Sequence, residues 1–422
     1  MKDSIVSQNL FRYPERLRQI FNILAKNGAR PIIVGGFVRD ALLGIQERKD
    51  IDIEVYGIDS YDTLTKLLAP FGSVCLVGKS FGVCKLKIGE VECDFSLPRK
   101  ETKIACGHKG FAVQTDASLS FKEASARRDF TINALGYDPI AAVLLDEYGG
   151  VSDLKNKTLR AVNTETFKED PLRVLRGVVF AARFSFHFHP TLTTLCKEMI
   201  KNDMLAELPK ERVFEELKKL FEKSKKPSRA FLLLKRLGEN LYFDELFSLQ
   251  KEKFKRTLVA LDSLACKNEK ELALFFASML VFLSSPEDIL QRFTNDKKLL
   301  RKTLDLITNH KLLLQMLKNG YNEVQLKLAA AKMQIEPVLR FIEALYPEMR
   351  HSVEIMRKEA QKLGILYEPL PPVVTGKRLQ EAGFAPSKEF KKILDELYLL
   401  QLQGEEINDK YLHEYLTKKG YL

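Results

Sequence analysis

The sequence lacks long apolar runs and has few cysteines. No run of about 18 or more apolar residues occurs, which excludes an ordinary membrane-spanning helix. The opening stretch, MKDSIVSQNLFRYPERLRQ, lacks the apolar core of a signal peptide, so we expect a cytoplasmic protein with no membrane partner. Six cysteines in 422 residues, none in a CxxC pair, favour neither a disulfide framework nor a zinc site. Cys75, Cys84 and Cys93 lie in predicted strands, where we expect small buried side chains.

The composition is that of a folded protein with several domains. A chain of 422 residues is too long for one ordinary core, so two to four domains are expected. The net charge of +11 suggests a polyanionic partner, although a basic surface without such a partner is the alternative.

Two styles of sequence divide the chain. Up to about residue 160, short β-rich runs alternate with helix-like stretches and glycine turns, which predicts a domain built on a small sheet. Beyond it, amphipathic patterns such as LPKERVFEELKKLFEKSKK predict helices only. A proline-rich link at 367–374 precedes a final helical segment. The predicted fold class is α+β, with a small mixed sheet followed by an all-α remainder.

Acidic and apolar residues alternate in KDIDIEVYG. A strand places Asp50 and Asp52 on one face and the two isoleucines on the other, toward the core. Adjacent carboxylates repel each other unless a cation lies between them, and hard oxygen ligands suit Mg²⁺. In a two-metal site, one ion activates an attacking hydroxyl and the other stabilises the leaving group. The alternative is a solvated strand face. Asp94, with Glu92 on the same face of a later strand, is the candidate third carboxylate.

The segment PIIVGGFVRDALLG precedes this strand. It predicts a strand, a tight turn at Gly35 and Gly36, and a helix. Helix N-terminal amides attract phosphate, and Arg39 on the first turn is placed to reach the same anion.

Four ordered motifs resemble a known family. GGFVRDALLG, DID, RRDFTINALGYD (127–138) and EDPLRVLRGVVFAARF (169–184) are similar to the motifs of class II tRNA nucleotidyltransferases. These are the bacterial and eukaryotic CCA-adding enzymes, with their relatives the bacterial poly(A) polymerases. The resemblance is strong over about residues 30–220 and implies that the first two motifs hold a triphosphate and metals. It implies that Arg128 and Asp129 contact the incoming ribose and triphosphate, accompanied by Asn133 and Arg127.

The same resemblance assigns the base choice to the fourth motif. Asp170, Arg173 and Arg176 share one stripe of a helix, and Glu169 is placed to brace Arg173. An Asp accepts from the exocyclic amine that C and A both carry, and an Arg donates to a ring nitrogen or carbonyl. One departure is Val179, where family members often have Arg; Arg183 is a partial substitute.

The remaining segments follow from the resemblance. It implies a nucleotidyltransferase head (1–160), a helical neck with the base template (161–225), a helical body (226–365) and a helical tail (366–422). Residues 100–126 resemble the family's flexible loop, including His108 and Lys109. The body resembles an HD-type phosphohydrolase module without its His-Asp pair, so we predict no phosphatase activity. In the tail, the resemblance implies tRNA phosphate contacts by Lys377, Arg378, Lys391 and Lys392.

These observations predict a CCA-adding tRNA nucleotidyltransferase. It would add CMP and AMP from CTP and ATP to the tRNA 3′ end, using two Mg²⁺ ions. The alternatives are an enzyme that adds only A or only CC, a poly(A) polymerase, or a non-catalytic RNA-binding module. The sequence leaves open whether the protein is a monomer or a homodimer.

Overall fold

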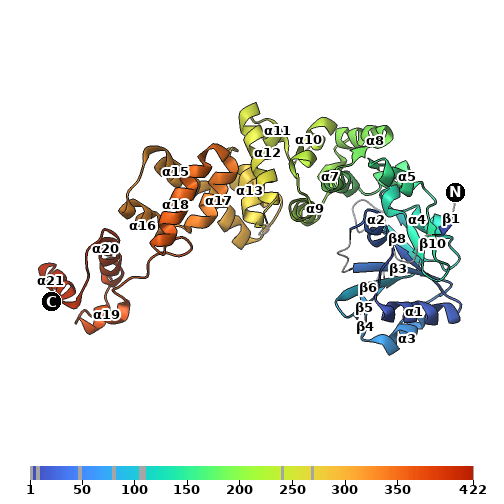
Figure 1. Cartoon of the computed structure of the whole chain (residues 1–422), viewed down its shortest axis with the longest axis horizontal. Helices are drawn as coiled ribbons and strands as arrows, with labels where there is room; N and C mark the ends of the chain where they lie inside the picture. Colours follow the sequence, from blue (N-terminus) through green and yellow to red (C-terminus); the bar gives the residue numbers. More distant parts are fainter. Residues whose placement is uncertain are drawn as a thin grey trace. The chain divides into compact units, whose positions relative to one another are not determined.

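The chain forms two compact units, Met1–Asp244 and Glu245–Leu422 (Figure 1). The structure is a computed structural model that describes residues 3–5, 10–45, 50–77, 82–103, 111–238, 242–267 and 270–421. These units are coarser than the four predicted segments, whose boundaries stay predictions. Within the described ranges, no helix combines the length and apolar character needed to cross a membrane.

A mixed sheet organises the first unit, in the strand order β1-β10-β9-β2-β3-β6-β5-β4. Strands β3 and β6 run parallel, and the other neighbours run antiparallel. The strands of this sheet are β1 (Asp3–Ile5), β2 (Arg30–Val34), β3 (Asp50–Tyr56), β4 (Val74–Val77), β5 (Val83–Ile88), β6 (Val91–Ser96), β9 (Gly136–Asp138) and β10 (Val143–Leu145). Two short ribbons pair β7 (Arg99–Lys103) with β8 (Phe111–Thr115), and β11 (Thr158–Leu159) with β12 (His187–Phe188). The mixed sheet and the helices that follow it confirm the predicted fold class.

Helices cover the sheet and continue beyond it within the first unit. They are α1 (Glu15–Lys26), α2 (Gly36–Leu42), α3 (Tyr61–Leu68), α4 (Phe121–Ser125), α5 (Gly150–Lys155), α6 (Thr164–Lys168), α7 (Leu172–Phe184), α8 (Pro190–Lys201), α9 (Lys210–Lys223) and α10 (Ser228–Leu237), with 3-10 turns η1 (Ala69–Phe71), η2 (Thr131–Asn133) and η3 (Met204–Glu207). Helices α1 and α3 contact each other and the same sheet, as Figure 1 shows at the base of the unit. Helix α7 packs against both α9 and α10.

The alternation predicted for β3 is confirmed. Ile51 and Ile53 are buried, whereas Asp50 and Asp52 are exposed. The prediction of three buried cysteines is wrong for one of them: Cys84 and Cys93 are buried, but Cys75 is exposed. Cys75 lies on β4, which is the edge strand of the sheet among the described residues.

The predicted loop at 100–126 contains regular structure. Strands β7 and β8 pair in register from Arg99 opposite Thr115 to Lys103 opposite Phe111. The short helix α4 follows, with a capping box between Ser120 and Glu123. A separate two-stranded ribbon need not bury one face, so its sequence carries no strong hydrophobic alternation. His108 and Lys109 lie outside the described residues.

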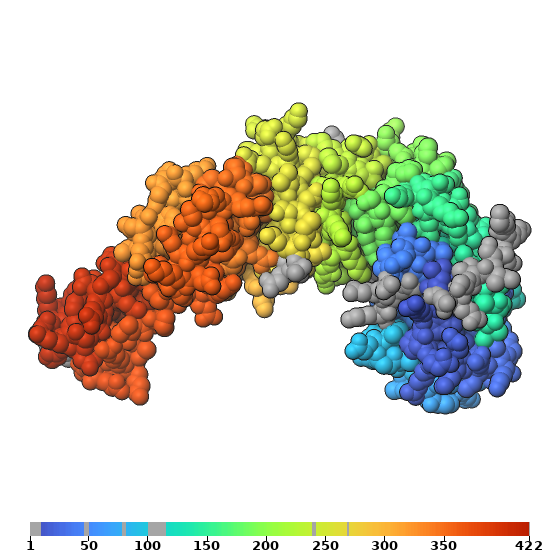
Figure 2. All heavy atoms as spheres, in the orientation of Figure 1, coloured from blue at the N-terminus to red at the C-terminus, as the bar shows by residue number. Residues whose placement is uncertain are grey.

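The second unit is helical throughout its described residues. Its elements are α11 (Asp244–Phe247, starting at the last residue of the first unit), α12 (Lys251–Ala265), α13 (Leu272–Leu280), α14 (Pro286–Gln291), α15 (Lys297–Asn319), α16 (Glu323–Ala330), α17 (Ile335–Leu345), η4 (Pro347–Met349), α18 (Arg350–Lys362), α19 (Gly376–Glu381), α20 (Phe390–Leu402) and α21 (Asp409–Lys418). Helices α12, α13, α15 and α17 pack against one another, and Figure 2 shows this part of the chain in yellow to orange. The last helices enclose a core of their own that includes Leu379, Ile393 and Leu416.

Candidate functional site

The paired carboxylates Asp50 and Asp52 lie on an open face of β3, between two strands that shape their surroundings. Asp52 is opposite Val34 of β2 on one side and Asp94 of β6 on the other. Gly35 follows directly after β2, and its φ of +69° is a conformation that a residue with a side chain rarely adopts. A Cβ on Gly35 would lie 3.9 Å from Asp52 Oδ2, so the glycine turn and the acidic strand adjoin.

The electrostatics of Asp52 are those of a crowded acidic site. The side chain is solvent-accessible, yet desolvation by the surrounding protein raises the pKa of its carboxyl. The charges of Asp94, Asp50 and Glu54 raise this pKa further, whereas Arg128 lowers it. Asp94 itself forms an ion pair with Lys85 at 3.1 Å. Unrelieved repulsion among carboxylates is the setting in which a cation binds.

The donor set fits Mg²⁺. Among the described residues, no group of three or more His, Cys, Asp or Glu side chains converges on one point that could hold a metal. Mg²⁺ is commonly bound through one or two carboxylates plus substrate phosphates and water, without an all-protein cage. Asp50 and Asp52 are a pair of carboxylates of this kind, and Asp94 lies opposite Asp52 on the neighbouring strand.

Arg127 and Arg128 both contact Glu54, the third acidic residue of β3. Glu54, only 1% exposed, accepts hydrogen bonds from Arg128 Nη2 at 2.9 Å and Arg127 Nη2 at 3.0 Å. The Tyr56 hydroxyl donates to the same carboxylate at 2.9 Å. Burial opposes ionisation of Glu54, but both arginines and Tyr56 outweigh it, and the pKa of the carboxyl lies below its usual range. The period-two alternation of β3 gives Glu54 the same face as Asp52, but that local pattern does not indicate this buried pairing with two arginines.

Asp129 and Asn133 lie at the centre of a buried polar network. Asp129 Oδ2 accepts from Arg176 Nε at 2.9 Å and Nη2 at 2.6 Å, and Asp129 Oδ1 accepts from Asn133 Nδ2 at 2.8 Å. Asn133 Oδ1 accepts from Arg39 Nη1 at 2.6 Å. Arg39 is 5% exposed and also pairs with Asp40, so its guanidinium supports Asn133 and does not project into solvent.

The residues predicted to choose the base lie at the start of α7 and just before it. Asp170 accepts a bidentate pair from Arg212 of α9, at 3.1 and 2.9 Å. Arg173 donates to the carbonyl oxygens of Thr166 at 2.9 Å and Arg127 at 2.7 Å, where the sequence predicted bracing by Glu169. Glu169 ends α6 and is partly exposed. The structure therefore brings Arg173 next to the segment that carries Arg127 and Arg128.

The departure at Val179 has a structural explanation. Val179 is 8% exposed and belongs to the face of α7 that packs on α9, where a guanidinium would be buried. Arg183, one turn further along α7, lies 3.5 Å from Asp40.

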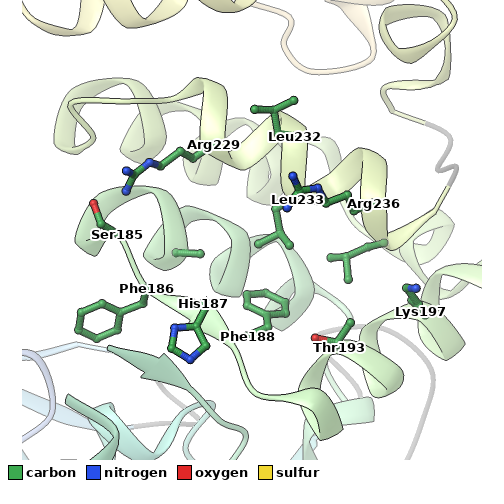
Figure 3. Close-up of a pocket in the computed structure, with 12 residues that line it drawn as sticks. Ser185, Phe186, His187, Phe188, Thr193, Lys197, Arg229, Leu232, Leu233 and Arg236 are labelled. Carbon is green, nitrogen blue, oxygen red and sulfur yellow. The ribbon is translucent and has the colours of Figure 1, made fainter. Parts of the chain in front are cut away.

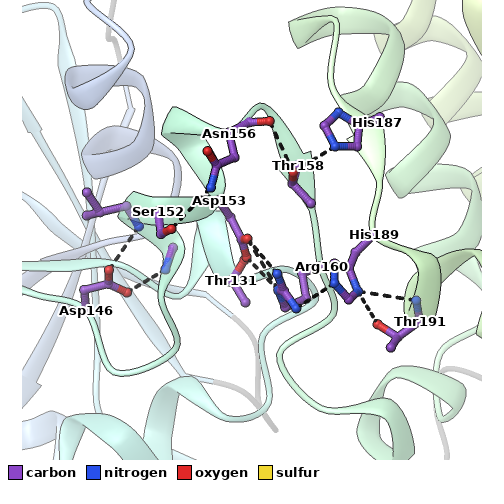
Figure 4. Close-up of polar contacts among 12 residues, drawn as sticks. Thr131, Asp146, Ser152, Asp153, Asn156, Thr158, Arg160, His187, His189 and Thr191 are labelled. Carbon is purple, nitrogen blue, oxygen red and sulfur yellow. Dashed lines mark hydrogen bonds and ion pairs between the residues drawn. The ribbon is translucent and has the colours of Figure 1, made fainter.

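A second polar network, which sequence reasoning missed, joins the end of the sheet region to α8 (Figure 4). The Arg160 guanidinium donates to Asp153, which is 4% exposed, and to His189 Nε2 at 3.0 Å. Thr131 donates to Asp153 Oδ2 at 2.6 Å. This network and the β11–β12 pairing hold the two ends of the α6–α7 segment together.

A groove of about 680 Å³ lies among α7, α8 and α10 (Figure 3). Basic side chains line it together with apolar ones, including Lys197, Arg229 and Arg236 with Leu232 and Phe188. None of the predicted site residues lines this groove.

Of the predicted tail residues, Lys377, Lys391 and Lys392 are exposed and Arg378 is partly exposed. Lys391 and Lys392 line a shallow concavity of about 470 Å³ on α20, together with Lys388. Lys377 is 3.7 Å from Glu381, and Arg378 pairs with Asp409 at 2.7 Å. In the body, His310 is buried and its Nδ1 is hydrogen-bonded to the Ile307 carbonyl at 2.7 Å, so it is a core side chain.

Comparisons with known proteins agree with this geometry. Residues 32–160 match the poly A polymerase head domain, and residues 185–242 match the probable RNA and SrmB-binding site of polymerase A. The multifunctional CCA protein of Chromobacterium violaceum is 41% identical over 206 residues, covering 49% of this chain and 48% of that protein. The CCA-adding enzyme of Coxiella burnetii is 38% identical over 207 residues, covering 49% and 52%. The chain thus spans about half the length of the curated relatives it matches.

Solved structures extend the likeness in fold to the whole chain. The Thermotoga maritima CCA-adding enzyme complexed with tRNA has a TM-score of 0.72 at 22% identity, covering 99% of both chains. The Bacillus stearothermophilus CCA-adding enzyme in complex with CTP has a TM-score of 0.73 at 22% identity, covering 98% of both. Residues 32–160 thus match a poly A polymerase head domain that carries the acidic strand, and the chain as a whole shares the fold of the solved CCA-adding enzymes.

Proposed function

We propose that this protein adds CMP and AMP from CTP and ATP to the 3′ end of tRNA. One observation carries the proposal: the exposed pair Asp50 and Asp52 adjoins Arg128, and the backbone of Arg127 is hydrogen-bonded to the base-choice residue Arg173. A metal-binding strand and a base-reading helix are thereby connected in one unit. The relatives named as CCA proteins support the choice of reaction.

Asp50 and Asp52 are proposed to hold two Mg²⁺ ions, with Asp94 as a further ligand. Bound metal would favour the attacking 3′-hydroxylate and offset charge on the leaving pyrophosphate. Within the protein, Arg128 opposes the rise in the Asp52 pKa, and Lys85 forms an ion pair with Asp94. Because Gly35 has no side chain, the Arg128 guanidinium fits beside it, where we propose that it pairs with oxygens of the triphosphate.

Asp170 and Arg173 are proposed to choose the base. A carboxylate has lone pairs beyond the two that Arg212 occupies, and a guanidinium has donors beyond the two that Arg173 uses on carbonyls. Both side chains are partly exposed, so they keep capacity for the edge of C or A. Arg176, Asp129 and Asn133 position the ribose end, Arg39 acts through Asn133, and Glu169 lines the same approach.

The exposed lysines Lys391 and Lys392 with Lys377 and Arg378 are proposed to contact tRNA phosphates, which position an RNA without reading its sequence. We place the reaction in the cytoplasm, where its proposed substrates are found.

The nearest alternative is a poly(A) polymerase or an enzyme that adds only CC or only A. The chain after β3 lacks the arginine-rich stretch VGRRFR that the bacterial poly(A) polymerases tend to show. The retained acids at 50, 52, 129, 169 and 170 argue against a non-catalytic RNA-binding module.

The test uses three tRNAs, ending before CCA, after C and after CC. The purified chain is incubated with labelled CTP and ATP, separately and together, in Mg²⁺. We expect CMP on the first two, AMP on the third, and no extension after CCA is complete. Addition restricted to one nucleotide would establish a CC-only or A-only enzyme, long A tails a poly(A) polymerase, and no incorporation at all would overturn the proposal.

A further inference from the structure

Glu54 is a buried carboxylate next to the proposed metal ligands, and the proposed reaction does not use it directly. It follows Asp52 by two residues on β3 and is 1% exposed. Its Oε1 accepts from both Arg127 and Arg128, and its Oε2 accepts from Tyr56. One acid therefore holds two guanidinium groups side by side, which would otherwise repel each other.

Arg128 connects Glu54 with the surroundings of Asp52, the proposed metal ligand. Its Nη1 donates to the Asn133 carbonyl at 3.3 Å and lies 2.9 Å from the position a Cβ on Gly35 would take. Asp52 Oδ2 is 3.9 Å from that same position. The Arg128 side chain is 17% exposed, so its charge is held at one place at the edge of the acidic face.

Arg127 connects Glu54 with Arg173 on α7, the helix proposed to choose the base. Its carbonyl oxygen accepts from Arg173 Nη2 at 2.7 Å, while its own guanidinium is bound to Glu54. Movement of the Arg127 side chain would displace the backbone that fixes Arg173. Glu54 is thus linked through Arg128 to the space beside Gly35 and Asp52. Through Arg127 it is linked to Arg173 of the base template.

We propose that Glu54 is a positioning residue that sets the triphosphate-binding and base-reading groups at a fixed distance from each other. This inference rests on the proposed nucleotidyl transfer. A buried ion pair with several hydrogen bonds fixes geometry better than exposed pairs, whose long side chains retain their freedom. The chemistry recognised is that of a nucleoside triphosphate, with its phosphates near Arg128 and its base near Arg173.

The test is Glu54→Gln, which keeps the shape of the side chain and removes its charge. We expect the KM for CTP and for ATP to rise about tenfold or more, with a smaller fall in kcat, because charge-assisted hydrogen bonds to both arginines are weakened. Discrimination of CTP against UTP should fall as well, since Arg173 loses its fixed partner. The Kd for tRNA should not change.

The matched control is Asp138→Asn. Asp138 is a carboxylate of the same sheet, 3% exposed, which pairs with Arg30 at 2.7 Å away from the site. Its variant should lose a similar amount of stability and keep the wild-type KM and discrimination. Equal kinetic effects in the two variants would mean that Glu54 is only structural.

If Glu54→Gln does not fold, Tyr56→Phe is tested instead. This substitution removes one hydrogen-bond donor to Glu54 and leaves the Glu54 carboxylate in place. A rise in KM of about twofold or more supports the inference, and an unchanged KM overturns it. A wild-type chain that incorporates nucleotides, with a Glu54 variant of unaltered KM and discrimination, overturns this inference alone. A wild-type chain that incorporates none, and to which labelled CTP does not bind, overturns the proposed function instead.

Discussion

Asp129→Asn removes the charge at the centre of the buried network while keeping the side chain's size. In the native protein, burial opposes ionisation of Asp129, but Arg176 and Asn133 outweigh it and hold the pKa of the carboxyl below its usual range. The substitution leaves Arg176 with Glu216 at 3.9 Å and the charge of Asp170. Breaking a fully buried pair costs about 3–5 kcal/mol. Because the Arg176 side chain is 33% exposed, we expect a smaller loss in the free energy of unfolding, about 2–3 kcal/mol.

The loss of unfolding free energy in Asp129→Asn should depend on pH. A carboxyl with a lowered folded-state pKa stabilises the fold above its unfolded pKa, about 3.9, and the stabilisation is lost as the pH falls through the folded value. The difference between wild type and variant should therefore be full at neutral pH and shrink below about pH 4.

Urea unfolding followed by circular dichroism measures the difference, and Glu15→Gln is the control. Glu15 forms an exposed pair with Arg18 at 3.5 Å, and its loss should cost about 0.5 kcal/mol or less. A cost for Asp129→Asn no larger than that of the control, or one that grows as the pH falls, would refute the reasoning.

Three further predictions concern the turn, the template and the loop. Gly35→Ala should destabilise the fold and reduce nucleotide incorporation, because its Cβ would lie 2.9 Å from Arg128 Nη1. The control is Gly44→Ala, at a position with a similar φ and nothing within 4 Å. This variant should lose only the backbone strain energy of about 1 kcal/mol and keep its activity. Arg212→Ala should loosen Asp170 and lower the preference for CTP over UTP, as single-nucleotide kinetics would show, with the Kd for tRNA unchanged. Ser120→Ala removes the capping box of α4 and should lower the free energy of unfolding by about 1 kcal/mol, measured by urea titration, without changing the KM for CTP.

The acidic strand could be predicted from sequence because its information is local. Alternation along β3 places Asp50 and Asp52 outward and Ile51 and Ile53 inward, and the structure has this arrangement. The register of Asp94 beside Asp52 follows from the parallel pairing of β3 and β6, which the sequence suggested only by the spacing of its acids.

The hydrogen-bond and ion-pair partners of the predicted residues could not be predicted from the local sequence pattern. Glu54 looks like a third solvent-facing acid until Arg127 and Arg128, which come from far along the chain, are placed over it. Arg39, predicted to project toward an anion, turns inward because Asn133 and Asp40 offer it buried acceptors. Contacts of this kind depend on tertiary structure, which local periodicity does not contain.

The most direct test of the central claim is nucleotide incorporation by the double variant Asp50→Ala, Asp52→Ala. Single-turnover assays with tRNA lacking CCA, CTP and Mg²⁺ would compare it with wild type and with Asp62→Ala, an exposed acid on α3 of the same unit. The account predicts that the double variant folds and incorporates no CMP, while Asp62→Ala matches wild type. CMP incorporation by the folded double variant at the wild-type rate would contradict it.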